Sequence, residues 1–250
     1  MLQVIKMEVK FEENKLERIV LDFERACFAN FAKEFPQADL VGCEFHWKQC
    51  LYRNLQTTGL IPLYNQDQDF QFYMKLIYSL AYVPILIDRI GGAYDTVVLR
   101  FLEDHEDDEN FVEGKEDIAE YESYIERTWI GKKRNGNRRP PLFNYQTWSK
   151  YESILDGKAT TNNSSEGFNS AWNQSMEKKP SVWSVVEGFR REDCMARTSL
   201  REQAVGGDAP DRNKSRTLRR EQRREEMRQL CQRFNNLPLK EYMGLMTTFV

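Results

Sequence analysis

The sequence has no long hydrophobic run. Its longest apolar stretch, LIYSLAYVPILI at residues 76–87, has 12 residues and contains Pro84, whereas a membrane-spanning helix needs about 20 apolar residues. The first fifteen residues, MLQVIKMEVKFEENK, alternate apolar and charged side chains and lack the apolar core and cleavage site of a secretory signal. We therefore expect no membrane partner and a location inside the cell.

Cysteine and histidine are also scarce. The chain has five cysteines at irregular spacing and two histidines, which indicates reduced thiols rather than a disulfide framework. Cys43, His46 and Cys50 lie close together, but a structural zinc site normally has four ligands, and His105 sits in an acidic segment. Zinc is therefore disfavoured. In the alternative, Cys43 packs as a small apolar residue and His46 forms a hydrogen bond near the end of a sheet.

The net charge of −3 conceals strong segregation of charge. Residues 101–126 carry twelve acids and one lysine, whereas residues 131–140 carry five basic residues and no acid, and residues 211–233 carry nine basic residues and four acids. Basic windows of this kind are typical of polyanion-binding faces and nuclear addresses. Solvated helix surfaces are the alternative explanation.

Hydrophobic periodicity predicts an α/β chain that becomes mostly α. Residues 17–22 and 38–45 read as strands, and each is followed by a helix. Beyond residue 66 the pattern is helical, with a short strand near residues 142–145. The predicted helices span residues 66–82, 85–103, 112–129, 164–177, 181–203, 213–234 and 238–247. We expect four segments, namely a partial strand and helix core at 1–60, a helical insertion at 61–158, two helices at 159–205, and basic helices at 206–250.

Asp22 and Glu166 are the candidate metal-binding acids. Asp22 ends the first predicted strand, where α/β sheets expose functional groups, although it could instead cap the following helix. Glu166 stands in ATTNNSSEGFNSAW, and with Asn163 as N-cap it would occupy the third helical position of a capping box. A carboxylate in the first turn of a helix could equally face a metal at a strand end.

Several segments, in shared order and spacing, resemble the transposases of Mutator-like elements. The segments that carry the resemblance are residues 21–60 (LDFERACFANFAKEFPQADLVGCEFHWKQCLYRNLQTTGL), 79–84 (SLAYVP), 124–131 (YIERTWIG), 138–152 (RRPPLFNYQTWSKYE) and 160–173 (TTNNSSEGFNSAWN). The resemblance implies an RNase H-like domain with a DDE acid triad, in which Asp22 is the second acid and Glu166 the third. It also makes Cys43 and His46 the family's C-x-x-H signature, with a role in organising the site or the DNA strand.

The mechanism implied by the resemblance is two-metal phosphoryl transfer on DNA in the nucleus. Carboxylates would hold two Mg²⁺ ions about 4 Å apart, one activating water or a 3′-OH and the other stabilising the leaving oxygen. Basic side chains would contact DNA phosphates. The expected contacts are Lys132, Lys133, Arg134, Arg138, Arg139, Arg219, Arg220, Arg223 and Arg224.

The sequence departs from the family pattern at its start. Residues 1–21 contain no aspartate, and only glutamates at 8, 12, 13 and 17 precede Asp22. We therefore expect a carboxyl-terminal part of the domain, truncated and nearly inactive alone, since in-line transfer requires tightly fixed ions. An upstream transposase portion or a second copy would complete it, and no small-molecule substrate is expected. The alternatives are a transposase-derived DNA-binding or regulatory protein without catalysis, and a helical interaction protein with a solvated charged surface.

Overall fold

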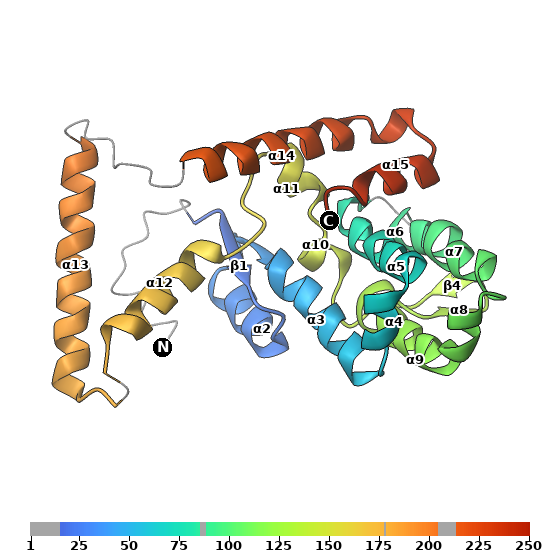
Figure 1. The fold of residues 1–250 in the computed structure, drawn as a ribbon. Coiled ribbons are helices and arrows are strands. Elements are labelled where there is room, and N and C mark those ends of the chain that lie inside the picture. Colours follow the sequence, from blue (N-terminus) through green and yellow to red (C-terminus); the bar gives the residue numbers. More distant parts are fainter. Residues whose placement is uncertain (1–15, 86–88, 178, 205–213) are drawn as a thin grey trace. The chain divides into compact units, whose positions relative to one another are not determined.

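The computed structural model describes residues 16–85, 89–177, 179–204 and 214–250. They form two compact units (Figure 1). The larger unit contains the described residues up to Thr161 together with Arg223–Val250, and the smaller unit contains the described residues from Asn162 to Gln222. Helix α14 (Lys214–Gln232) contributes residues to both.

The larger unit begins with a β-α-β arrangement. Strands β1 (Arg18–Leu21) and β2 (Asp39–Gly42) pair in parallel, with Leu21 opposite Gly42, and helix α2 (Arg25–Glu34) connects them. Parallel strands need such a crossover, and α2 ends just before Pro36, which disfavours helical backbone in the residue ahead of it. Helix α3 (Glu44–Thr57) follows β2. The carboxyl ends of both strands therefore meet at one edge of the sheet.

The rest of the larger unit is mostly helical, apart from a short hairpin. The amino end of α5 is fixed by Asp67, whose side chain accepts the Phe70 N–H at 2.8 Å. The elements are α4 (Ile61–Gln66), α5 (Gln68–Ser79), the 3₁₀ turn η1 (Leu80–Tyr82), α6 (Arg89–Ala93), the π-helical turn η2 (Tyr94–Val98), α7 (Leu99–Asp104), α8 (Glu109–Glu113), α9 (Lys115–Ile125), the π-helical turn η3 (Glu126–Ile130), α10 (Tyr145–Trp148), α11 (Tyr151–Leu155), the 3₁₀ turn η4 (Phe234–Asn236) and α15 (Leu239–Met246).

Three tryptophans from distant segments form the centre of the core. Trp47 on α3 stacks on Trp148 of α10, with ring centroids 5.1 Å apart and planes at 8°, and meets the edge of Trp129 at 6.4 Å. All three side chains are buried. The carboxyl-terminal part of the chain joins the same core, since the hydroxyl of Tyr242 donates to the carbonyl of Tyr82. The helices, rather than the small sheet, thus supply most of the buried surface.

The smaller unit is built around two helices, α12 (Asn163–Ser175) and α13 (Val182–Ala204). Trp172 of α12 stacks on Phe189 of α13 at 4.5 Å. Gly188 permits this approach, because a Cβ atom there would lie 2.8 Å from the Trp172 ring. The two helices therefore pack through an aromatic pair over a glycine.

The mostly helical α/β class predicted from the sequence is confirmed. The prediction of a short strand near residues 142–145 is wrong, because the structure has no strand there. The second sheet is instead a hairpin of β3 (Lys133–Arg134) and β4 (Asn137–Arg138). Its turn residues, Asn135 and Gly136, have φ of 52° and 81°, as an Asn-Gly hairpin turn requires. At the predicted position, Asn144 caps α10 by accepting the Gln146 N–H at 2.8 Å.

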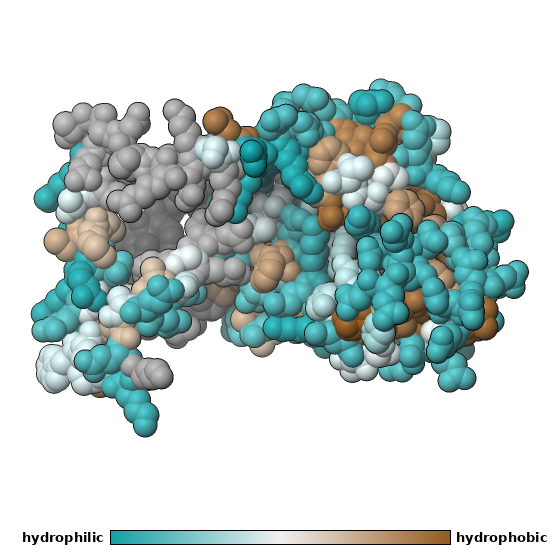
Figure 2. Space-filling view, viewed as in Figure 1, coloured by the Kyte–Doolittle hydropathy of each residue, from teal (hydrophilic) through white to brown (hydrophobic). Residues whose placement is uncertain are grey.

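The face shown in Figure 2 is mostly hydrophilic, with apolar patches interrupting it. No helix in the described ranges combines the length and the hydropathy needed to cross a membrane. Among the described side chains, the large exposed apolar ones include Val182 and Trp183 at the start of α13, which are 78% and 77% exposed.

Candidate functional site

Asp22 and His46 meet at the carboxyl edge of the parallel sheet. Asp22 directly follows β1, and His46 lies in the first turn of α3, directly after β2. Nδ1 of His46 lies 2.9 Å from Oδ1 of Asp22. The Asp22 side chain is 51% exposed and that of His46 is 22% exposed. The sheet thus brings together two of the predicted site residues and leaves the carboxylate accessible to a ligand.

Asp22 is not the cap of the next helix. Helix α2 begins at Arg25 with Glu24 as its N-cap, and no side chain caps it. The backbone carbonyl of Asp22 accepts the Glu24 N–H at 2.7 Å in this turn. The capping alternative for Asp22 is therefore wrong, and its carboxylate faces α3 instead.

The two residues of the C-x-x-H signature have different environments. Cys43 is the N-cap of α3 and is fully buried, as expected for a cysteine that packs as a small apolar residue. His46 is partly exposed and contacts Asp22. The spacing therefore places a packing residue at the strand end and, one helical turn later, a polar residue at the site.

A buried polar group beside the signature was not identified from the sequence. The ammonium of Lys150, whose residue is fully buried, donates to the carbonyl of Gly42 at 2.6 Å. Glu44, also at the start of α3, accepts the Tyr82 hydroxyl at 2.7 Å and lies 2.9 Å from the Lys48 ammonium. The sequence could have pointed to Glu44, because it is an acid directly after Cys43. Nothing in the local sequence WSKYE indicates that Lys150 is buried.

The charges of this group are set by burial and by one another. Burial lowers the pKa of Lys150 to about 8, although the nearby Glu44 carboxylate raises it. Burial raises the pKa of Glu44, but Lys48, the Tyr82 hydroxyl and Thr160 oppose this and leave the pKa below its ordinary value. Glu44 is therefore a largely buried carboxylate that stays ionised at the start of α3.

The segment that leads to Glu166 starts beside the same strand ends. The carbonyl of Thr160 accepts the backbone N–H of Glu44 at 2.9 Å. Glu166 itself lies within α12, and its side chain is outside the described residues, so its pairing with Asp22 stays a prediction. The predicted Asn163 N-cap is wrong, because the N-cap is Asn162, without a side-chain cap bond, and α12 starts at Asn163.

Another part of the described chain holds a possible metal-ligand group. Asp69, His105 and Asp108 each place one ligand atom within 4.8 Å of the others, and both aspartates are exposed. It is the only group of three or more such residues that the described ranges contain. Cys43, His46 and Cys50 are not part of such a group, and the argument against zinc at the signature stays a prediction.

The predicted DNA contacts in residues 131–140 differ in exposure. Lys132, Lys133, Arg134 and Arg139 are exposed. Arg138 is largely buried, donates to the carbonyls of Gly131 and Gly91, and forms an ion pair with Asp95. Lys133 also lies 3.0 Å from Asp95. The side chain of Arg138 therefore fixes the hairpin to η2 and is engaged within the protein rather than with a DNA phosphate.

The four predicted contacts on α14 are also unequal. Arg219, Arg220 and Arg223 are exposed, and Arg223 donates to the Thr248 carbonyl at 3.5 Å. Arg224 is half-buried and donates to the carbonyl of Lys158. The exposed members are available to phosphates, whereas Arg224 ties α14 to the segment before α12.

The comparisons with known proteins supply no relative for this site. No family model matches the sequence, and neither the curated proteins nor the solved structures compared with it gave a match.

Proposed function

We propose that this chain is part of a DNA transposase domain of the Mutator-like, RNase H-like type. Asp22 is the second metal-binding acid and Glu166 the third, and the ancestral activity is two-metal phosphoryl transfer on DNA. The observation that carries the proposal is the contact of Asp22 with His46 at the carboxyl edge of a parallel sheet. In open α/β sheets, this edge is where ligands bind.

Two features of the larger unit and the chemistry of Mg²⁺ support the proposal. The Asp22 carboxylate is half-exposed, as a metal ligand facing DNA must be. Thr160, six residues before Glu166, is hydrogen-bonded to the start of α3 next to the site. Carboxylate oxygens are the ligands that Mg²⁺ prefers, and Mg²⁺ is the ion that phosphoryl-transfer sites commonly use. Asp22 and Glu166 are the residues that would hold it.

The role of His46 in this proposal is to position Asp22. A ring nitrogen 2.9 Å from Oδ1 fixes one carboxylate oxygen, and a carboxylate held in this way by a neighbouring group is oriented for its ligand. Lys150 fixes the end of β2 through the Gly42 carbonyl and keeps the two strand ends in place.

We further propose that the chain alone is catalytically inactive or nearly so. Two acids alone hold a metal ion only loosely. In-line phosphoryl transfer, in contrast, requires two metal ions, each positioned to well below 1 Å. DNA would then be bound through the exposed basic residues without being cut, in the nucleus and with a second copy or another transposase portion as partner.

Metal binding at Asp22 can be tested with Mn²⁺ as a paramagnetic probe in NMR. We expect Mn²⁺ to broaden the backbone amide signals of residues 22–24 and 44–46, and Asp22→Asn to abolish the effect. Asp39→Asn is the matched control, because Asp39 is 59% exposed and lies at the other end of the sheet, near Arg18. Broadening that is unchanged by Asp22→Asn would refute the proposed metal site.

Catalysis is tested separately by incubating the protein with double-stranded DNA and Mg²⁺ or Mn²⁺. We expect salt-dependent binding without strand cleavage. Cleavage that is lost in Glu166→Gln would refute the proposed inactivity and support a complete site. Salt-dependent binding with no Mn²⁺ effect at Asp22 would favour the second candidate, a DNA-binding protein derived from a transposase, which the exposed Lys132, Arg134 and Arg139 favour.

A further inference from the structure

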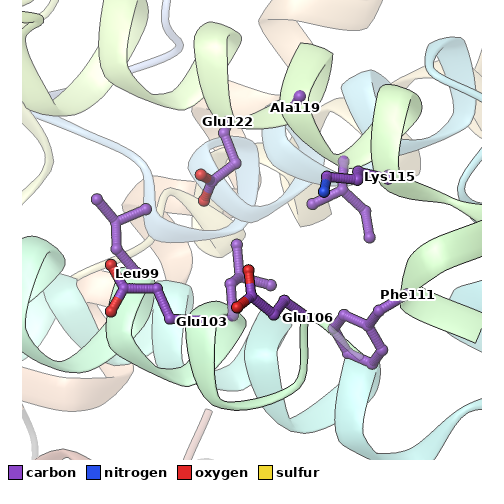
Figure 3. A pocket seen from close by; sticks show the side chains of 9 residues that line it. Leu99, Glu103, Glu106, Phe111, Lys115, Ala119 and Glu122 are labelled. Carbon is purple, nitrogen blue, oxygen red and sulfur yellow. The ribbon is translucent and has the colours of Figure 1, made fainter. Parts of the chain in front are cut away.

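A pocket of about 290 Å³ lies in the helical part of the larger unit, away from the Asp22 edge. It lies between α7, with the turn that follows it, and the α8 and α9 helices (Figure 3). Its apolar lining comes from Leu99, Leu102, Phe111, Ile118 and Ala119, and its charged lining from Glu103, Glu106, Lys115 and Glu122. All of these residues belong to one compact unit.

Glu122 is the most enclosed charged group of the pocket. In Figure 3 its carboxylate extends from α9 into the cavity, towards the wall that carries Glu103 and Glu106. The hydroxyls of Tyr73 and Tyr94 both donate to its Oε1, at 3.0 and 3.3 Å. Within the described chain no donor to Oε2 accompanies them, so this second oxygen has room for a further donor.

The charges around the cavity favour a cation. Three carboxylates line it against one ammonium. Glu103, Glu106 and Lys115 are exposed at its rim, where Glu103 also pairs with Arg100 at 3.0 Å, while Glu122 lies deeper. A positive group placed against Glu122 would be partly shielded from water, where an ion pair is stronger than at the surface. The apolar lining would meanwhile accept a hydrocarbon or aromatic body.

We propose that this pocket binds a small organic cation, an ammonium or amidinium group on an apolar body, with the charged group against Glu122. The body lies against Leu99, Leu102 and Ile118, and the rim acids attract the ligand. The sequence pattern gave no sign of such a site, which is independent of the transposase proposal.

The size of the cavity restricts the ligand. Drug-sized ligands occupy pockets of roughly 300–1,000 Å³, so 290 Å³ corresponds to a small molecule. At the roughly 30 Å³ that one water occupies in the liquid, the space is that of about ten heavy atoms. 2-Phenylethylammonium is a probe of this size, and 2-phenylethanol and 3-phenylpropanoate match its shape with neutral and negative groups.

Binding of a cation at Glu122 should depend on pH. Burial raises the pKa of Glu122 to about 7, while the Tyr73 and Tyr94 hydroxyls lower it and the nearby Glu126 carboxylate raises it further. Lys115, Glu103 and Glu106 also face the pocket from α9 and from α7 and its following turn. Because the carboxylate that meets the cation forms through this range, affinity for the ammonium probe rises between pH 6 and pH 8.

The experiment follows the δ1 methyl signal of Ile118 by NMR while each probe is titrated. We expect 2-phenylethylammonium to shift this signal at pH 8 with an affinity about five to ten times that of 2-phenylethanol. 3-Phenylpropanoate should bind more weakly still. The preference for the ammonium should shrink severalfold at pH 6.

Glu122→Gln tests the charge without removing an acceptor, since its amide oxygen can still receive both tyrosine hydroxyls. We expect this variant to lose most of the preference for the ammonium over the alcohol, because only the rim acids remain, and to lose the rise in affinity between pH 6 and pH 8. Glu120→Gln is the matched control, because Glu120 lies on the same helix, is exposed and does not line the pocket. Circular dichroism and thermal unfolding establish that each variant is folded.

Three results would overturn the proposal. These are equal affinities for the three probes, an unchanged preference in Glu122→Gln, and an Ile118 methyl signal that does not move when the ammonium probe is added. Any of these results would leave the Mn²⁺ experiment at Asp22 unaffected, because the two sites share no residue.

Discussion

The ammonium of Lys150 donates to the carbonyl of Gly42 at 2.6 Å and joins residues 108 positions apart in the chain. The bond crosses from the segment after α10 to the last residue of β2. It ends beside Cys43, the first residue of the C-x-x-H signature. A buried cation therefore fixes the strand end from which α3 projects His46 towards Asp22.

The lowered pKa of Lys150 predicts a specific pH dependence of stability. Its pKa of about 8 in the folded chain lies below the ordinary value of 10.5, so the unfolded chain binds more protons between these values. Its contribution to the free energy of unfolding therefore increases as the pH rises from about 8 to 10.5, by at most about 1.4 kcal/mol per pH unit. Urea denaturation at pH 7.5, 8.5 and 9.5 measures it.

Lys150→Met should remove this increase. The difference in unfolding free energy, wild type minus variant, should therefore become more positive with pH. Lys75→Met, at an exposed position on α5, is the control and should leave the pH dependence as in the wild type. A wild-type minus Lys150→Met difference that stays constant from pH 7.5 to 9.5 would contradict the burial of a charged lysine.

Gly42→Ala should destabilise the protein by about 1–3 kcal/mol. A Cβ atom at position 42 would lie 2.1 Å from the ring of Phe23, and that ring is held by edge contacts with Trp129 and Phe143. Gly244→Ala is the control, because its Cβ would meet nothing within 4 Å. It lies in helix α15, where alanine is favoured over glycine by about 0.5–1 kcal/mol. Thermal unfolding of both variants gives the comparison.

The sequence was sufficient to predict elements whose apolar pattern is strong. The two strands and the helices after them lie close to where periodicity placed them, because Leu21, Val41, Trp47 and Leu51 are buried. It failed near residues 142–145, where aromatic residues suggested a strand. The backbone there instead precedes a helix capped by Asn144, and the Asn-Gly turn at 135–136 marks the real hairpin. Local turn chemistry outweighed side-chain type.

The candidate site was predicted only in part, for a physical reason. Strand ends can be read from a sequence, so Asp22 and His46 were expected near one edge, and the structure places them 2.9 Å apart. Lys150 could not be found this way, since its burial depends on the fold bringing residue 150 to the end of β2. The arginine pattern likewise could not separate Arg138, which Asp95 holds, from the exposed Arg139.

DNA binding by the exposed hairpin residues should depend on salt. Each phosphate contact contributes about −0.9 to the slope of log affinity against log salt concentration. Arg134→Ala with Arg139→Ala should therefore make the slope less steep by about 2 and weaken binding. Fluorescence anisotropy with a labelled duplex measures this. The matched control, Arg100→Ala with Lys75→Ala, removes the same charge elsewhere, and Arg100 lies beside Glu103 and Asp104. Equal loss of slope in both pairs would argue for a diffuse charge effect rather than a DNA surface.

Glu122→Gln should stabilise the protein above neutral pH. The pKa of Glu122 is raised by burial to about 7, from an ordinary value of 4.5, so the folded chain binds more protons between these values. For this group, stability is therefore greatest below about pH 4.5 and is lost as the pH rises to about 7. The loss is at most about 3 kcal/mol.

The glutamine has no proton to lose and keeps an acceptor for the Tyr73 and Tyr94 hydroxyls. The variant should consequently gain about 1–3 kcal/mol over the wild type at pH 8 and little at pH 4.5, measured by urea denaturation, while Glu120→Gln should show no such trend. A gain that is the same at both pH values would mean that the Glu122 carboxylate is not desolvated by the pocket.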